Sequence, residues 1–120
     1  MGLIFVEARP FTEDIQAMDA EDELKALQEE LLQNPNAGAV LSQTGGFSKI
    51  RMPAKAKGKR GGARVIYLYL KEYSIVFFLF VYPKNEAENL SMKQKQYLKK
   101  LSHEIRKTIP NSQYAQWAVL

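Results

Sequence analysis

The spacing of apolar residues in the first part of the chain predicts one strand followed by helices. Residues 3–7 have the pattern of a short strand, and a brief helix is expected to start near Thr12. Residues 19–33 then carry leucine at intervals of three and four, which is the period of a helix with one apolar face: Leu24, Leu27 and Leu31. We expect Asp19 to cap this helix and Asn34-Pro35 to end it.

The middle of the chain changes to the pattern of strands. The three strand candidates are residues 47–52, 64–70 and 74–82, and a short turn at residues 71–73 joins the last two. Residues 75–81 are apolar at every position, which is typical of a strand that is covered on both faces. The sheet therefore needs a covering layer on each side.

A last apolar stripe predicts a C-terminal helix. Ser91 and Gln94 have the spacing of a capping box, and Leu98, Leu101 and Ile105 follow at helical intervals. Its exposed flank is expected to carry the basic residues Lys93, Lys95, Lys99, Lys100, Arg106 and Lys107. The order of elements predicts an α+β fold in which an antiparallel twisted sheet is packed by N-terminal helices and a C-terminal helix. Residues 1–109 form this single domain, and residues 110–120 are a tail without an assigned role.

Charge is divided unequally along the 120 residues, whose formal net charge is +4. Residues 1–48 carry nine acidic and two basic side chains, whereas residues 49–120 carry four and fifteen. The basic part would steer the protein toward an anionic partner. The absence of cysteine excludes disulfides and thiolate metal sites, and no segment has the pattern of a secretory signal or the length of a membrane span. We therefore expect a cytoplasmic protein with no membrane partner.

The densest group of cations lies between two pairs of glycines. From Lys49 to Arg64 there are seven basic residues and no acidic one. We expect a loop between strands to carry four of them, and these are candidates for binding an RNA backbone: Lys55, Lys57, Lys59 and Arg60. A solvated loop without a ligand, or a localisation or heparin-type patch, would have the same composition. Composition alone does not distinguish these alternatives from an RNA-binding loop.

The strands that flank this loop can bring further cations together. Alternation along a strand places Lys49 and Arg51 on one face and turns Ile50 to the other. Arg64 starts the next strand candidate and Lys84 follows the third, so these residues would meet if the three strands are neighbours. The alternative is that these cations are ordinary charged residues on the wet face of a sheet.

Three motifs in a fixed order resemble the RelE superfamily of bacterial toxins, and most closely its HigB branch. They are GGFSKIR at residues 45–51, KGKRGGARVIY at residues 57–67 and VYPKNE at residues 81–86, followed by the capped helix. The likeness covers residues 3–108. It implies the toxin of a type II toxin–antitoxin system, a ribosome-dependent mRNA endoribonuclease that cleaves A-site codons and inhibits translation.

The resemblance also implies the chemistry and the partners. The ribose 2′-hydroxyl attacks the adjacent phosphate, without a metal or cofactor, and gives a 2′,3′-cyclic phosphate and a free 5′-hydroxyl. The implied partners are the ribosome, mRNA and a HigA-like antitoxin, and operator DNA would be met only through that antitoxin.

Residue roles follow from the same resemblance. Lys49 matches the position of the general base, and cations around a lysine favour its neutral form. Arg51 and Arg64 match positions that clamp the scissile phosphate, which a planar guanidinium can bind through two hydrogen bonds. Lys84 is the nearest match for the acid or for a further phosphate contact. Well-known members often have arginine where this chain has Lys84-Asn85 and tyrosine near Leu90, so these motifs leave the acid and the stacking residue open.

Aromatic and imidazole side chains add little further chemistry. Tyr67 or Tyr82 could stack on a base or orient the ribose, although a tyrosine among apolar residues, such as Tyr67, usually packs in the core. His103 is the only histidine and is interpreted as a residue on the surface of the final helix.

Two other classes of function use the same cations. A non-catalytic nucleic-acid-binding module or operon regulator would grip phosphates in the same way, but the chain has no helix-turn-helix pattern. A phosphate-loop nucleotide enzyme is excluded, because Gly58-Lys59 is followed by Arg60 instead of serine or threonine.

Overall fold

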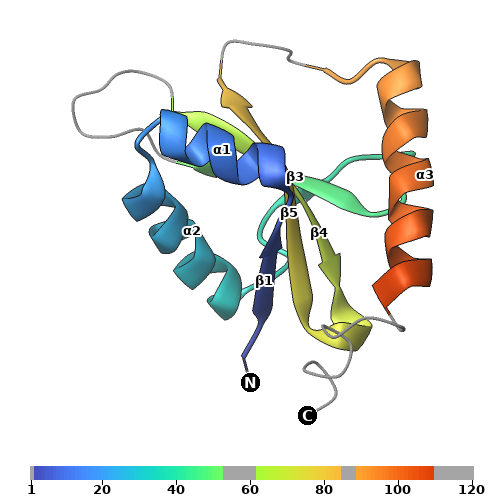
Figure 1. Cartoon of the computed structure of the whole chain (residues 1–120). Coiled ribbons are helices and arrows are strands. Elements are labelled where there is room, and N and C mark those ends of the chain that lie inside the picture. Colours follow the sequence, from blue (N-terminus) through green and yellow to red (C-terminus); the bar gives the residue numbers. More distant parts are fainter. Residues whose placement is uncertain (1, 53–61, 85–88, 110–120) are drawn as a thin grey trace.

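The computed structural model describes residues 2–52, 62–84 and 89–109 (Figure 1). The elements in chain order are β1 (Ile4–Glu7), α1 (Arg9–Ala17), α2 (Glu21–Gln33), β2 (Ala39–Val40), β3 (Phe47–Met52), β4 (Ala63–Leu70), a 3-10 turn (Lys71–Tyr73), β5 (Ile75–Pro83) and α3 (Met92–Thr108). The predicted loop cations Lys55, Lys57, Lys59 and Arg60, and the tail 110–120, lie outside the described residues.

The strands form one mixed sheet in the order β1-β5-β4-β3-β2. All neighbours are antiparallel except β1 and β5, which pair in parallel. The expectation of a purely antiparallel sheet is therefore wrong for one edge strand. A parallel pair needs a long crossover, and here the whole chain from α1 to β4 lies between its two strands.

Helices cover both faces of the sheet and create two cores. Figure 1 shows α1 and α2 on one face and α3 on the other. The first core includes Phe11 and Leu27 from the helices and Phe78 from β5. The second joins Leu98 of α3 to sheet residues such as Leu68. The predicted α+β fold is confirmed, and β5 is covered on both faces as its unbroken apolar run indicated.

The leucine repeat of α2 packs as its spacing predicts. Leu24, Leu27 and Leu31 are buried against the sheet. The start of the helix differs from the prediction, because Ala20 is the N-cap residue and Asp19 precedes it with a φ of 54°. Asp19 therefore lies in a left-handed turn before the helix, and the prediction that it is the N-cap residue is wrong.

The ends of the other two helices have clear local causes. In α3 the predicted capping box is present: the Gln94 backbone N–H donates to Ser91 Oγ (3.1 Å), and the Ser91 N–H donates to Gln94 Oε1 (2.8 Å). Helix α1 begins at Arg9, before the expected Thr12. Pro10 fits its first turn, because proline has no N–H and the N–H groups of a first turn have no carbonyl partner within the helix. Across the described ranges, no helix combines the length and apolar character that a membrane span requires.

Hydrogen bonds join helix α3 to the turn that precedes β3. Ser102 Oγ donates to the Gly45 carbonyl (2.7 Å), and the Arg106 guanidinium donates to the same carbonyl (3.3 Å) and to Ser102 Oγ (3.1 Å). Gly45 has a φ of 77°, and a Cβ there would lie 2.8 Å from the Ser102 Cβ. The turn therefore lies so close to α3 that only glycine fits at position 45.

Gly45→Ala is expected to lower the free energy of unfolding by about 1 to 3 kcal/mol, because it strains a left-handed residue and separates α3 from the turn. Urea unfolding measures the change. Gly2→Ala is the matched control, since a Cβ at Gly2 has no atom within 4 Å. Equal stability of the two variants would show that the contact with α3 is not close in solution.

Candidate functional site

Two rows of side chains cross the sheet on the face that α3 covers. In the first row Lys49 of β3, Ile66 of β4 and Phe80 of β5 are partners across the strands. In the second row the partners are Arg51, Arg64 and Tyr82. Lys49 and Arg51, which alternation predicted on one face, are thus brought together with Arg64 of the neighbouring strand, and adjacent strands are spaced about 4.8 Å apart. We call Lys49, Arg51 and Arg64 the cationic patch.

Strand alternation keeps apolar neighbours of the patch in the core. Ile50, between Lys49 and Arg51, is 8% exposed and packs in the core under α1 and α2. This confirms that the two cations of β3 share one face and that Ile50 faces the other.

A bulge in β5 turns aromatic side chains toward the patch. Ile66 pairs with Phe80 while the next residue, Tyr67, pairs with Phe78, so Leu79 has no partner in β4. This extra residue shifts the alternation along β5. Phe78 points to the α1 and α2 side, and beyond the bulge Phe80 and Tyr82 face the α3 side. Bulges that redirect side chains in this way are frequent beside active sites.

Arg51 and Arg64 lie directly opposite each other in register. Partners in such a pair have Cβ atoms about 4.5 to 5.5 Å apart, and like charges there are destabilising. Arg51 is exposed and Arg64 is half-buried, with Nη1 donating to the Ala63 carbonyl at 3.4 Å. Neither of the two rows contains an acidic residue. The pair is therefore suited to hold an anion between its guanidinium groups.

Lys84 lies at the same end of the sheet as the patch. Its backbone N–H donates to the Gly62 carbonyl at 3.1 Å, which places it beside the start of β4, and its side chain is exposed. His103 is exposed on α3, in agreement with its interpretation as a surface residue.

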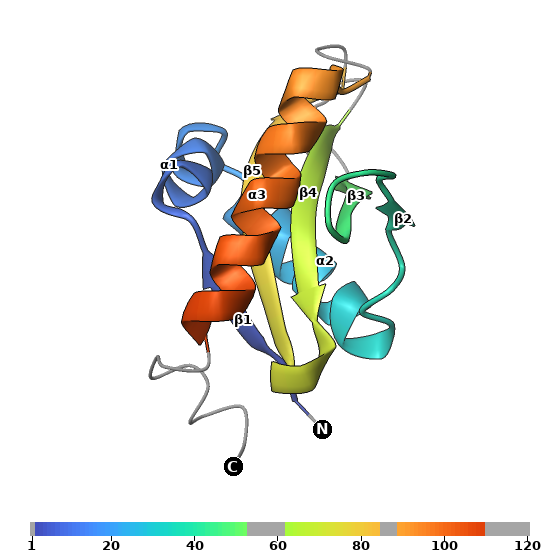
Figure 2. The ribbon, with the colours of Figure 1, turned by 90° about the vertical axis from the view of Figure 1, so that its right-hand side faces the viewer.

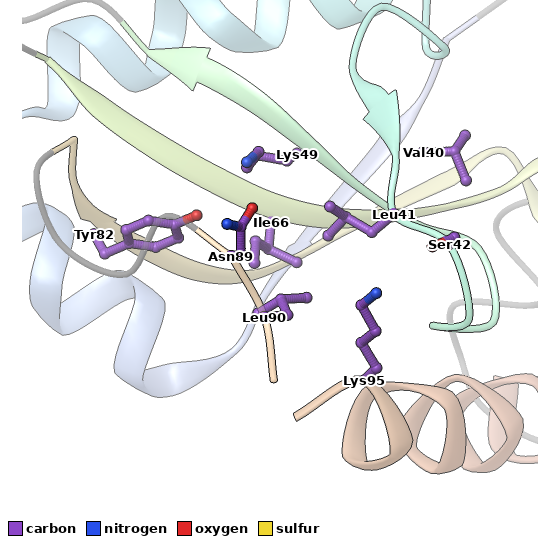
Figure 3. A pocket seen from close by; sticks show the side chains of 9 residues that line it. All are labelled: Val40, Leu41, Ser42, Lys49, Ile66, Tyr82, Asn89, Leu90 and Lys95. Carbon is purple, nitrogen blue, oxygen red and sulfur yellow. The ribbon is translucent and has the colours of Figure 1, made fainter. Parts of the chain in front are cut away.

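A hollow of about 360 Å³ opens between β3 and the start of α3 (Figure 3). Figure 3 shows Lys49 and Lys95 on opposite sides of it, with apolar residues between them. Its lining consists of Val40, Leu41, Ser42, Lys49, Ile66, Tyr82, Asn89, Leu90 and Lys95. This cationic hollow is open to solvent, and none of the described residues that line it is acidic.

Lys95 lies in a different environment from the one that its sequence pattern predicted. We expected it on the exposed flank of the helix, but it is half-buried and lines the cationic hollow. The sequence did indicate this position, because Lys95 precedes the buried Leu98 by three residues and so lies on the apolar face of the helix. Asn89 and the segment 40–42 were also missed, since only the tertiary fold brings them to the hollow.

A second, larger hollow of about 500 Å³ adjoins the first. It shares Ile66, Tyr82 and Leu90 with the cationic hollow, and its remaining lining is Phe80, Lys93, Gln94, Tyr97 and Leu98. Figure 2 shows α3 running along β4 and β5, with β3 to the side of the helix. We call this second hollow the aromatic groove.

Tyr67 does not belong to this site. Its ring is fully buried on the opposite face, where its hydroxyl donates to the Pro35 carbonyl (2.8 Å) and accepts from the Gly38 N–H (3.0 Å). The hypothesis that Tyr67 stacks on a base is wrong, because no base can reach a ring in the core. Burial also raises the pKa of its hydroxyl above the ordinary value of 10.0.

Tyr67→Phe is expected to cost about 1 to 3 kcal/mol of stability, because it leaves the half-buried Gly38 N–H and Pro35 carbonyl without their partner. The folded state favours neutral Tyr67, so its contribution is full below about pH 10 and is lost as pH rises further. Urea unfolding at pH 8 and at pH 11 measures both effects. The stability difference between wild type and variant should shrink at the higher pH, and a difference that grows would contradict the direction of the shift.

Comparison with known proteins places these features in context. A family model described as the RelE toxin of the RelE/RelB toxin–antitoxin system matches residues 12–115. Among solved structures, the chain resembles an arginine-substituted mutant of E. coli toxin RelE in the free state, with a TM-score of 0.56 and 20% sequence identity. The match covers 86% of this chain and 98% of that chain. At this identity the structural likeness shows the shared fold alone.

Proposed function

This chain belongs to the RelE toxin family of toxin–antitoxin systems, and on that premise we propose that it is a ribosome-dependent endoribonuclease that cleaves mRNA codons in the A site. One observation carries the proposal. Arg51 and Arg64 face each other in register, with Lys49 on the same face, and no acid in either row. Such a group fits a phosphodiester better than any uncharged ligand.

Each cation has a role in the proposed reaction. Lys49 is the general base that removes the proton from the ribose 2′-hydroxyl, whose oxygen attacks the adjacent phosphorus. Arg51 and Arg64 stabilise the charge that builds on the phosphate oxygens in the transition state. Lys84 protonates the departing 5′-oxygen, or it contacts the phosphate while solvent water supplies that proton. The P–O5′ bond breaks, and the products are a 2′,3′-cyclic phosphate and a free 5′-hydroxyl.

The shape of the surface supports dependence on the ribosome. Among the described residues the patch and its hollow are open to solvent, and these residues provide charge without enclosing a substrate. Holding the 2′-oxygen in line with the leaving oxygen contributes much of the rate in such reactions. In this proposal the ribosomal A site supplies that alignment.

Primer extension on one mRNA, incubated with the protein in the presence and absence of translating ribosomes, tests the function. We expect cuts inside codons only when ribosomes are present. Efficient cutting of naked RNA would refute ribosome dependence. RNA binding without cuts in either sample would favour a non-catalytic nucleic-acid-binding module instead.

The family also implies an antitoxin partner. We propose that a HigA-like antitoxin covers the cationic face, that operator DNA is bound only through it, and that the toxin acts in the cytoplasm. Co-expression with the neighbouring small gene should relieve growth arrest and yield a stable complex. Growth without arrest when the protein is overproduced alone would contradict both the partner and the toxic activity.

A further inference from the structure

The aromatic groove exposes large rings beside the cationic patch. Phe80 is 40% exposed and Tyr97 is 57% exposed, although large aromatic side chains usually lie in the core. Both rings line the groove with Tyr82, and apolar side chains of Ile66, Leu90 and Leu98 complete it. The rings come from β5 and α3, so two separate elements present them to the same space.

We propose that the aromatic groove holds one unpaired base of a single-stranded RNA while the adjoining phosphates lie on the cationic patch. The inference rests on the proposed function for its RNA substrate and adds the place where a base is bound. Single-stranded RNA is recognised by aromatic side chains that stack on its bases next to cations that follow its backbone.

Charge and continuity favour RNA over an apolar occupant. The groove and the cationic hollow share three residues, so a chain that lies across one continues into the other. Phe80 is in the same row as Lys49, two strands away, which places their backbones about 10 Å apart. Lys93 lines the groove, and among the described residues no acidic side chain lines either hollow.

Gln94 adds a polar group that can orient the base. Its Oε1 accepts the Ser91 N–H in the capping box, which fixes the side chain at the start of α3. The amide nitrogen keeps two hydrogen atoms to donate. A carbonyl oxygen or ring nitrogen at the edge of a base is the acceptor that suits it.

Fluorescence of a single-stranded RNA hexamer that contains one 2-aminopurine tests the inference without ribosomes, because stacking quenches this base. Wild-type protein should quench it, and Tyr97→Phe, which keeps the ring, should quench it as well. Tyr97→Leu keeps an apolar side chain without a ring, so it should lose the quenching and bind the hexamer roughly 5- to 150-fold more weakly. A thermal midpoint equal to that of wild type verifies that Tyr97→Leu is folded, as expected for an exposed position.

The outcomes separate this inference from the proposed function. If Tyr97→Leu quenches and binds like wild type, the base site is overturned, whether or not wild type cleaves mRNA on ribosomes. If Tyr97→Leu loses the antitoxin but not RNA, the groove binds protein and the inference is again overturned. If Tyr97→Leu alone loses quenching while wild type fails to cleave mRNA on ribosomes, the base site stands and the nuclease proposal fails.

Discussion

Arg64→Ala is expected to slow mRNA cleavage on ribosomes by about 100- to 1,000-fold without unfolding the protein. The substitution removes one of two guanidinium groups that would stabilise the transition state, and the loss of one such donor has an effect of this size. Arg51→Ala and Lys49→Ala should give losses of the same order. Stability should change by no more than about 0.5 kcal/mol, because these side chains point out of the two cores. The midpoint of the arginine variants should even rise slightly, since like charges directly opposite each other are destabilising.

Cleavage rates and thermal midpoints have to be measured on the same samples. Lys25→Ala is the matched control, because Lys25 is exposed on α2, on the other side of the sheet, and it should cleave like wild type. Arg64→Lys keeps the charge but not the paired hydrogen bonds, so it should fall between wild type and Arg64→Ala. Full cleavage by Arg64→Ala would remove this residue from the site. Lost cleavage with a collapsed midpoint would make it a structural residue.

Elements with a local cause were predictable from the sequence. The leucine spacing in α2, the Ser91 capping box of α3 and the apolar run of β5 each act over a few neighbouring residues, and the structure contains all three. The parallel pairing of β1 with β5 was not predictable in this way. It depends on where the chain returns after more than sixty residues, and a strand of four residues carries no sign of its partner.

The residues of the candidate site were likewise predictable only where a local rule places them. Strand alternation placed Lys49 and Arg51 on one face, and the antiparallel pairing of β3 with β4 then brought Arg64 opposite Arg51. The same rule could have excluded Tyr67, because an odd number of positions separates it from Arg64 and so turns it to the other face. Phe80 and Tyr97 could not be found, since the first depends on a bulge at Leu79 and the second on the path of α3 across the sheet.

The bulge at Leu79 also explains how one apolar strand serves two purposes. Before it, β5 alternates between the two cores. After it, Phe80 and Tyr82 face the space beside the start of α3 that the helix leaves open. A single extra residue thus converts the end of a core strand into a wall of both hollows, next to the cations of β3 and β4.

Binding of the protein to ribosomes or RNA is expected to weaken steeply as the salt concentration rises. Six cations among the described residues line the two hollows or lie on the adjoining strand ends: Lys49, Lys93 and Lys95 in the lining, and Arg51, Arg64 and Lys84 at the ends of β3, β4 and β5. If each contacts one phosphate of a single strand, these six cations alone contribute about −4 to the slope of log K against log salt, which lowers the affinity roughly 300-fold between 50 and 200 mM salt.

The same measurement decides whether the lysine-rich segment contributes. Replacing Lys55, Lys57 and Lys59 together by alanine should make the slope less steep by about 2, because three phosphate contacts are lost and each contributes about 0.7 to the slope on a single strand. The control replaces three exposed lysines away from the hollows, Lys25, Lys71 and Lys107, and should leave the slope almost unchanged. Fluorescence anisotropy of a labelled single-stranded RNA at four salt concentrations gives both slopes. If the first triple variant keeps the wild-type slope, the segment is not part of the RNA interface, and the patch formed by β3 and β4 carries the electrostatic contacts without it.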